Sequence, residues 1–500
     1  MRDARALSQP RAMHVACKRL WRDSRALCHL FESVRRFRIH AALCRTCAMI
    51  RFPDHRLMRI KIAAMPDIDG VFAAGISMRA SIGPASIHAL RYIINTSYWR
   101  TNLKIPLAPP QPSRQPTGLP VLRLGFRPFY LGGAYFGIVS IALWLASLRG
   151  HPVAGLSSTM SGLAWHVHEM VFGFSAAIIV GFLLTAIRAW TSRDTPHGAQ
   201  LAALWLLWAA GRLLVWAGPE PLAAVVDSAF LPITAIILLR VLLAARNHRN
   251  VFLTVALFLF GALNALFHWW AAQGRLDLAL QAAYAAVGFV MLFVVVIAGR
   301  IVPTFTMNAI PGFTAKRWKF VETLAAPVTV LALCADAARL PGAIVAAVAS
   351  AAAALHATRI VGWRSWRIGA RPILWILHVA YAWVPVGFAM LALAALGVAP
   401  HSLAIHALTV GVIGGAIVAM ITRTALGHTG RPLRAGPAEI ACYWLLIAAA
   451  LVRVFAPWIA PDATRVWIDI AGACWIAAFA VYALRYTGYL TSPRIDGMAG

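Results

Sequence analysis

The chain has 500 residues, of which 60% are hydrophobic and only 13% are charged, and its mean hydropathy is +0.71. Soluble globular domains carry about a quarter charged residues, so the composition excludes an ordinary soluble protein. The formal net charge of +29 resembles that of a nucleic-acid-binding protein. The basic residues lie mostly in the first 120 residues or between apolar segments, however, and we therefore expect no nucleic-acid partner.

Residues 1–120 differ from the rest of the chain because they are basic and sustain no hydrophobic period. They contain an arginine-rich run at 34–38, no apolar core long enough for a signal sequence, and a proline-rich stretch at 106–120. We expect a disordered basic extension, or upstream sequence translated from a start codon assigned too early. Cys44 and Cys47 have the spacing of a zinc or redox pair, but no second pair accompanies them, which argues against a metal site there.

Residues 121–490 are a series of apolar stretches, each about 17–25 residues and therefore long enough to cross a bilayer. We expect an all-α protein, a polytopic membrane helical bundle of about twelve transmembrane helices with a short tail at 491–500. Its first partner is then the lipid bilayer. The expected spans are 130–148, 164–187, 200–217, 222–244, 251–272, 278–298, 320–338, 342–361, 371–396, 402–422, 438–456 and 466–486.

The arginine and lysine residues between the spans indicate the topology. Most of them follow even-numbered spans, whereas Arg212 and Arg453 are among the few near odd-numbered connections. By the positive-inside rule, both termini are cytoplasmic and the odd-numbered connections face the periplasm or the exterior.

Ionisable residues inside membrane segments are energetically expensive, so they are functional candidates. With this topology, four segments deliver polar side chains to one level near the outer face. They are His166, His168 and Glu169 in the second span, Asp227 in the fourth, Asn264 and His268 in the fifth, and His406 in the tenth. We expect the four imidazoles to lie side by side there as metal ligands. The carboxylates and the amide are candidates for orienting the ligands or carrying protons, and ordinary interface residues are the alternative.

Converging neutral imidazoles in an apolar, aromatic setting suit haem iron or copper. His166 and His168 are separated by about 200° around a regular helix, so they point to opposite faces and would address different cofactors. His166 shares its face with Met170, which is an alternative soft ligand. For each histidine taken alone, a hydrogen-bonding role near the interface is the competing interpretation.

A second polar level is expected at the cytoplasmic side, where the sixth and tenth spans end. Its members are Arg300, Asn308, Arg423, His428 and Arg431. The guanidinium groups match the carboxylate geometry of haem propionates, and the alternative is that they anchor helix ends at lipid phosphates. Pro303 is expected to end or break the sixth helix.

Several long motifs occur in one order along the chain and together resemble the NnrS family over roughly residues 121–435. They are Leu124-Gly-Phe-Arg-Pro-Phe-Tyr130, Trp165-His-Val-His-Glu-Met-Val-Phe-Gly-Phe174, Gly181-Phe-Leu-Leu-Thr-Ala186, Gly299-Arg-Ile-Val-Pro-Thr-Phe-Thr306, His406-Ala-Leu-Thr-Val-Gly411 and Leu426-Gly-His-Thr-Gly-Arg431.

This resemblance implies a bacterial inner-membrane protein that carries haem and copper and acts in denitrification or in protection against nitric oxide and nitrosative stress. Nitric oxide is then the expected small-molecule ligand, and no electron donor is indicated. The residues to which the cofactor roles carry over are His166, His168, His268, His406 and His428 as ligands, Arg300, Arg423 and Arg431 as cofactor-binding cations, and Glu169, Asp227, Asn264 and Asn308 as supporting groups.

Two other function classes stay open. A transporter of a metal complex or small ion would use the same polar groups as a translocation site, and inverted repeats would support it. A distant relative of the haem-copper oxidases would also have twelve helices with buried histidines, but this chain has no adjacent His-His pair and no His-Pro-Glu stretch. Whether the protein is an enzyme is left open.

Overall fold

The computed structural model describes residues 48–51, 57–65, 73–79, 118–151 and 160–498. The chain divides into two units, Met1–Pro109 and Pro110–Gly500. In the first unit, three strands form an antiparallel sheet in the order β1 (Ala48–Arg51), β2 (Leu57–Met65) and β3 (Ala73–Arg79). Cys44 and Cys47 lie outside the described residues, and the disorder expected for residues 1–120 stays a prediction.

The second unit is an all-helical bundle, and the described residues include twelve helical spans that are long and apolar enough to cross a membrane. The expectation of a polytopic membrane protein is confirmed. The helices are α3 (Phe126–Leu148), α4 (Gly162–His168), α5 (Ala176–Thr191), α6 (Ala199–Ala217), α7 (Glu220–Ala244), α8 (Phe252–Ala272), α9 (Leu276–Ala309), α10 (Lys319–Ala337), α11 (Gly342–Gly362), α12 (Pro372–Ala395), α13 (His401–His406), α14 (Gly415–His428), α15 (Pro437–Ile459) and α16 (Thr464–Thr491). The π-helix η4 (Glu169–Ser175) joins α4 to α5, and the π-helix η7 (Ala407–Gly414) joins α13 to α14.

The sixth span is longer than expected because α9 continues past Pro303, and the prediction that this proline ends or breaks the helix was wrong. Two hydroxyl groups that follow the proline bond to the helix itself. Thr304 Oγ1 donates to the carbonyl of Arg300 at 2.7 Å, and Thr306 Oγ1 donates to that of Val302 at 2.8 Å. Such side-chain bonds help transmembrane helices to tolerate proline.

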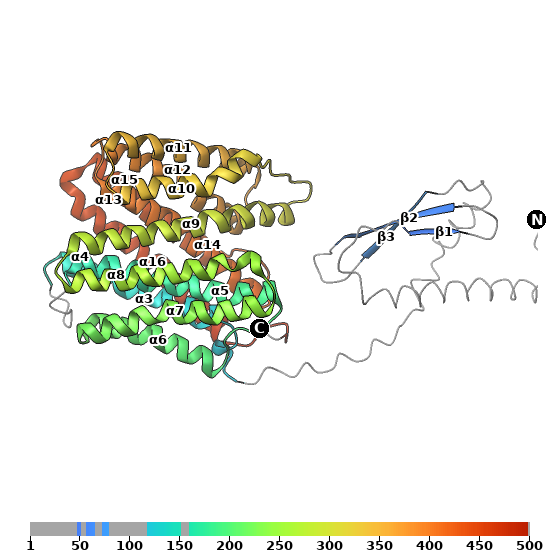
Figure 1. Cartoon of the computed structure of the whole chain (residues 1–500), viewed down its shortest axis with the longest axis horizontal. Coiled ribbons are helices and arrows are strands. Elements are labelled where there is room, and N and C mark those ends of the chain that lie inside the picture. Colours follow the sequence, from blue (N-terminus) through green and yellow to red (C-terminus); the bar gives the residue numbers. More distant parts are fainter. Residues whose placement is uncertain (1–47, 52–56, 66–72, 80–117, 152–159, 499–500) are drawn as a thin grey trace, which may run out of the picture. The chain divides into compact units, whose positions relative to one another are not determined.

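The packing order of the spans places α9 in the middle of the bundle, with α8 on one side and α10 on the other (Figure 1). The last span, α16, packs along both α15 and α3, so the two ends of the bundle's chain lie side by side. Large aromatic residues fill this contact, among them the fully buried Tyr130, Phe174, Phe479 and Tyr482. The first and last spans therefore close the bundle.

Arg127, inside the first of the resemblance motifs, joins the start of α3 to the end of α16. Its side chain is fully buried, and Nη1 donates to the carbonyls of Leu490 at 2.9 Å and Ser492 at 2.8 Å. The last carbonyls of a helix have no partner within the helix, so a buried helix end needs an outside donor. Arg127 supplies that donor, which gives the motif a structural role.

We predict that Arg127→Met destabilises the protein by about 1–3 kcal/mol, because buried carbonyls at the end of α16 lose a charged donor. The measurement is the midpoint of thermal unfolding in detergent. Arg127→Lys is the matched control and should recover part of the loss, since an ammonium group can still donate. A midpoint unchanged in the methionine variant would contradict this role.

Candidate functional site

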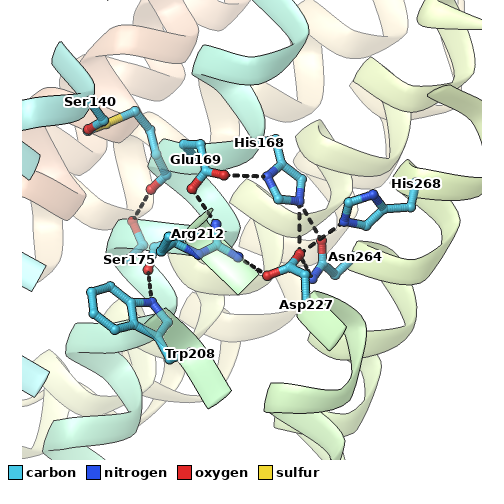
Figure 2. A network of polar contacts seen from close by, with 11 residues as sticks. Ser140, His168, Glu169, Ser175, Trp208, Arg212, Asp227, Asn264 and His268 are labelled. Atoms are coloured by element: carbon cyan, nitrogen blue, oxygen red, sulfur yellow. Dashed lines mark hydrogen bonds and ion pairs between the residues drawn. The ribbon is translucent and has the colours of Figure 1, made fainter. Parts of the chain in front are cut away.

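Six buried polar side chains from four membrane spans meet at one end of the bundle (Figure 2). They are His168 on α4, Glu169 on η4, Arg212 on α6, Asp227 on α7, and Asn264 and His268 on α8. None of them is more than 6% exposed. Most of the residues expected at one membrane level therefore do meet, in a group that we call the ion cluster.

Two imidazoles in the ion cluster converge on one carboxylate oxygen. Asp227 Oδ2 lies 3.1 Å from Nε2 of His168 and 3.0 Å from Nε2 of His268. Asn264 also donates to this oxygen at 2.7 Å, and its own Oδ1 lies 3.0 Å from His168 Nε2. Ligand atoms of His168, Asp227 and His268 all lie within 4.8 Å of one another, which is compact enough to surround a metal ion with bonds of about 2.0–2.2 Å.

Arg212 forms ion pairs with both acids of the ion cluster, Glu169 and Asp227. Glu169 in turn places Oε1 3.4 Å from Nδ1 of His168. With neutral imidazoles, one guanidinium faces two carboxylates, so the buried group carries one uncompensated negative charge. A cation bound next to these residues would balance this charge, and so would a proton on His168, whose two ring nitrogens both face carboxylate oxygens.

Two glycines make room for the ion cluster. A Cβ atom on Gly173 would meet the side chains of Glu169 and Arg212, and a Cβ atom on Gly211 would lie 3.0 Å from Asp227 Oδ1. Any larger residue at either position would displace the charged groups. The small residues of η4 and α6 are therefore part of what brings these helices close enough for the ion pairs.

A cavity of about 320 Å³ lies beside the ion cluster, and the other two histidines that were predicted as ligands line it. His166, His406 and Arg453 all line it, together with Met170. His166 and Met170 thus share a face, as predicted. His166 lines the cavity, whereas His168 belongs to the ion cluster. The four imidazoles form two pairs, and their part as metal ligands stays a prediction.

The hydrogen bonds of His406 and His166 leave ring nitrogens free for a ligand. His406 Nδ1 lies 2.6 Å from the carbonyl of Ser402, an acceptor that fixes the proton on Nδ1 and leaves the Nε2 lone pair unprotonated. His166 stacks on Trp144 with ring centroids 4.6 Å apart, and its buried Nδ1 has no hydrogen-bond partner among the described residues. Both rings are therefore prepared as neutral ligands.

Two other buried histidines show what a structural role looks like. His356 lies between Thr329 at 2.9 Å and Tyr381 at 2.8 Å, with one ring nitrogen toward each hydroxyl. His378 is likewise held between two hydroxyl groups. Both nitrogens of each ring are occupied, so these histidines connect helices and offer no free lone pair.

Both site spans change from α-helix to π-helix directly after a site histidine. η4 begins after His168, and η7 begins after His406. A π-helical turn holds an additional residue, which changes the direction of the side chains that precede it relative to those that follow, and such turns are frequent at functional sites. In each span, the site histidine before the π-helix and the core residues after it can therefore face different neighbours.

The predicted cytoplasmic group lies elsewhere in the bundle. His428 is 22 residues along the same span from His406, which corresponds to about 30 Å, so the two rings do not share a cofactor. Arg423 lies 4.1 Å above the ring of Phe305, and Arg431 lies 3.7 Å above the ring of Tyr489.

The remaining members of that group are Arg300 and Asn308, on the last part of α9. Arg300 Nη1 donates to Asn250 Oδ1 at 3.4 Å, and Asn308 is exposed. Their predicted part in cofactor binding stays a prediction, and the contact of Arg300 with Asn250 connects α9 to the segment before α8.

The tail after the last span, α16, packs against the end of α14. The Ile495 amide donates to the Thr429 carbonyl at 3.2 Å, and Arg494 Nη2 donates to Asp496 at 2.6 Å. The Arg494 hydrogen bond lowers the pKa of the Asp496 carboxyl to about 2. The pair is consequently charged at every physiological pH.

Sequence reasoning missed Arg212 and Arg453, which were counted only as topology markers near odd-numbered connections. Each lies within an apolar span, on α6 and α15 respectively. The rule that an ionisable residue inside a span is a functional candidate would have identified both. The pairing of Arg212 with Glu169 and Asp227, and the place of Arg453 beside His166 and His406, follow only from the packed structure.

The comparison with family models gives one match, to the family described as NnrS protein, over residues 120–494. The match covers most of the chain and includes every residue of the ion cluster and the cavity, and the protein belongs to the NnrS family. Membership supports a role in the response to nitric oxide. A search of the curated proteins finds no match.

We predict that Arg212→Met costs about 3–5 kcal/mol of stability, because it leaves two buried carboxylates without their cation. Thermal unfolding in detergent measures the loss. The control is Arg212→Met combined with Glu169→Gln, which removes one of the orphaned charges and should recover part of it. If the single and double variants unfold at the wild-type temperature, the ion pairs have no structural importance.

Proposed function

We propose that this protein is a haem- and copper-containing membrane protein that binds nitric oxide or protects cellular metal pools from it. The observation that carries the proposal is the division of four imidazoles into two adjacent sites, reached from one short helix through His166 and His168. Two ligand sites of different shape and charge suit two different cofactors.

The cavity suits haem. His166 and His406 provide neutral imidazoles, which are common axial ligands of haem iron. Arg453 lines the same cavity, and within the described residues no carboxylate pairs with its guanidinium. A haem propionate is an anion that such a group would hold. When bound, haem would supply an iron atom that coordinates nitric oxide.

The ion cluster suits copper. His168 and His268 would be the nitrogen ligands and Asp227 an oxygen ligand, and imidazole is a preferred ligand of copper. Asn264 would orient Asp227, to which it donates at 2.7 Å, and Glu169 would orient His168 through the ring nitrogen Nδ1, which lies 3.4 Å from Glu169 Oε1. The cation would also neutralise the charge that Arg212 leaves uncompensated.

The location that fits this function is the bacterial inner membrane with both termini in the cytoplasm, by the positive-inside rule. Both sites would then lie close to the periplasmic face, because they involve the start of α13 and the end of α8. Electrons, where the reaction needs them, would come from a donor that the chain does not identify.

One observation favours transport as a second candidate function. A polar pocket of about 350 Å³ contains Asp336, Arg339 and His401, with His401 Nε2 3.1 Å from the Asp336 carboxylate. Tyr284 lines both this pocket and the histidine-lined cavity. Two neighbouring compartments that share a lining residue would suit passage of a small polar complex.

We predict that the two histidine pairs control different metals. His166→Ala and His406→Ala should lose haem and keep copper, whereas His168→Ala and His268→Ala should lose copper and keep haem, because the pairs line separate sites. Visible spectra and elemental analysis of the purified proteins measure both.

The matched control is His356→Gln, which changes a buried histidine outside both sites and should keep both metals. If all four site variants retain full iron and copper, the assignment of ligands is wrong. A wild-type protein without a haem absorption band would overturn the haem proposal and leave the transport function as the better interpretation.

A further inference from the structure

A second cavity, of about 80 Å³, lies deeper in the bundle and is almost entirely apolar. It lies among α5, α9, α12 and the segment from η7 into α14. Tyr130 and Tyr381 are the only lining residues with a polar side-chain atom, and the Tyr381 hydroxyl is already bonded to His356 and Arg359. Apart from the Tyr130 hydroxyl, which has no hydrogen-bond partner among the described residues, charged ligands and water have nothing to bind there, and apolar cavities take up xenon or small apolar molecules.

This apolar cavity adjoins the histidine-lined cavity. Val290 on α9 and Ile413 on η7 line both of them, so these two side chains lie between the spaces. On its other flank, Phe182 of α5 meets Phe293 of α9 edge to face at 6.0 Å, and both rings are half-buried. The apolar cavity is therefore placed between two membrane helices and the candidate haem site.

The apolar lining of this cavity restricts which molecules can bind in it. A small neutral molecule loses no hydrogen bond or ionic hydration when it moves from lipid into an apolar cavity, whereas an ion or a polar complex does. Nitric oxide is neutral, diatomic and small enough for the space. Polar solutes would instead meet the pocket beyond Tyr284, which contains charged side chains.

We propose that the apolar cavity is a binding site for neutral diatomic gas, from which the gas reaches the histidine-lined cavity past Val290 and Ile413. This inference rests on the proposed function for its choice of ligand. The site gives the protein a store of gas next to the ligand histidines and keeps that approach free of water.

Xenon tests the binding site without any dependence on haem. Crystals of the full-length protein under xenon pressure should show anomalous density in the apolar cavity. Ala298→Phe, which fills this cavity from α9, should abolish the density. Leu259→Phe, at a position of α8 that is 55% exposed, is the matched control and should keep it. Wild-type crystals without xenon in this cavity would overturn the proposal, whether or not the protein holds haem.

Carbon monoxide tests the connection to the metal. After flash photolysis of the ferrous holoprotein, we predict that the bimolecular rebinding rate falls about tenfold in Ala298→Phe and in Ile413→Phe, because the approach is blocked. It should be unchanged in Leu259→Phe. If Tyr284→Ala accelerates rebinding while the two phenylalanine variants leave it unchanged, gas arrives through the polar pocket and the proposed route is wrong. A preparation without haem would refute the cofactor proposal alone, since the xenon result stands by itself.

Discussion

The compensation of charge in a low-dielectric interior is the constraint on which the site depends. Arg212 is placed between Glu169 and Asp227, and none of the three is more than 6% exposed. Without the guanidinium, two carboxylates would face each other in the membrane, at a cost of several kcal/mol. With it, α6 is fixed against η4 and α7, and the two acids are held where they can orient His168 and His268. The same ion pairs therefore support the fold and the ligands.

The other buried arginines of the bundle differ in the partners that surround them. Arg359 bonds to Glu322 at 2.6 Å, the Tyr381 hydroxyl at 2.7 Å and the Val295 carbonyl at 3.0 Å. Arg453, in contrast, lines a cavity beside two imidazoles, and the described residues give it no carboxylate. An arginine paired with a carboxylate joins helices, whereas one without a carboxylate beside two imidazoles supports the proposal of an anionic group in the cavity.

Hydropathy and depth could be read from the sequence. They predicted the twelve spans, and they placed His168, Asp227 and His268 at one level, where the structure brings these side chains together. The hydropathy of a span and the depth of a residue within it follow from the residues of that span alone. The rotation of each helix depends on packing, and it decides which imidazole meets which. Only the opposite directions of His166 and His168 were predictable, from their separation within one helix. The pairing of each with His406 or His268, and the counter-charges Arg212 and Arg453, required the packed bundle.

The two sites cannot be moved independently, because they share α4. His166 and His168 are on one helix of seven residues, followed at once by the π-helix that contains Glu169 and the cavity residue Met170. A change that rotates this segment to suit a ligand in the cavity must also shift His168 against Asp227. One short helix therefore fixes the position of His166 in the cavity and of His168 in the ion cluster together.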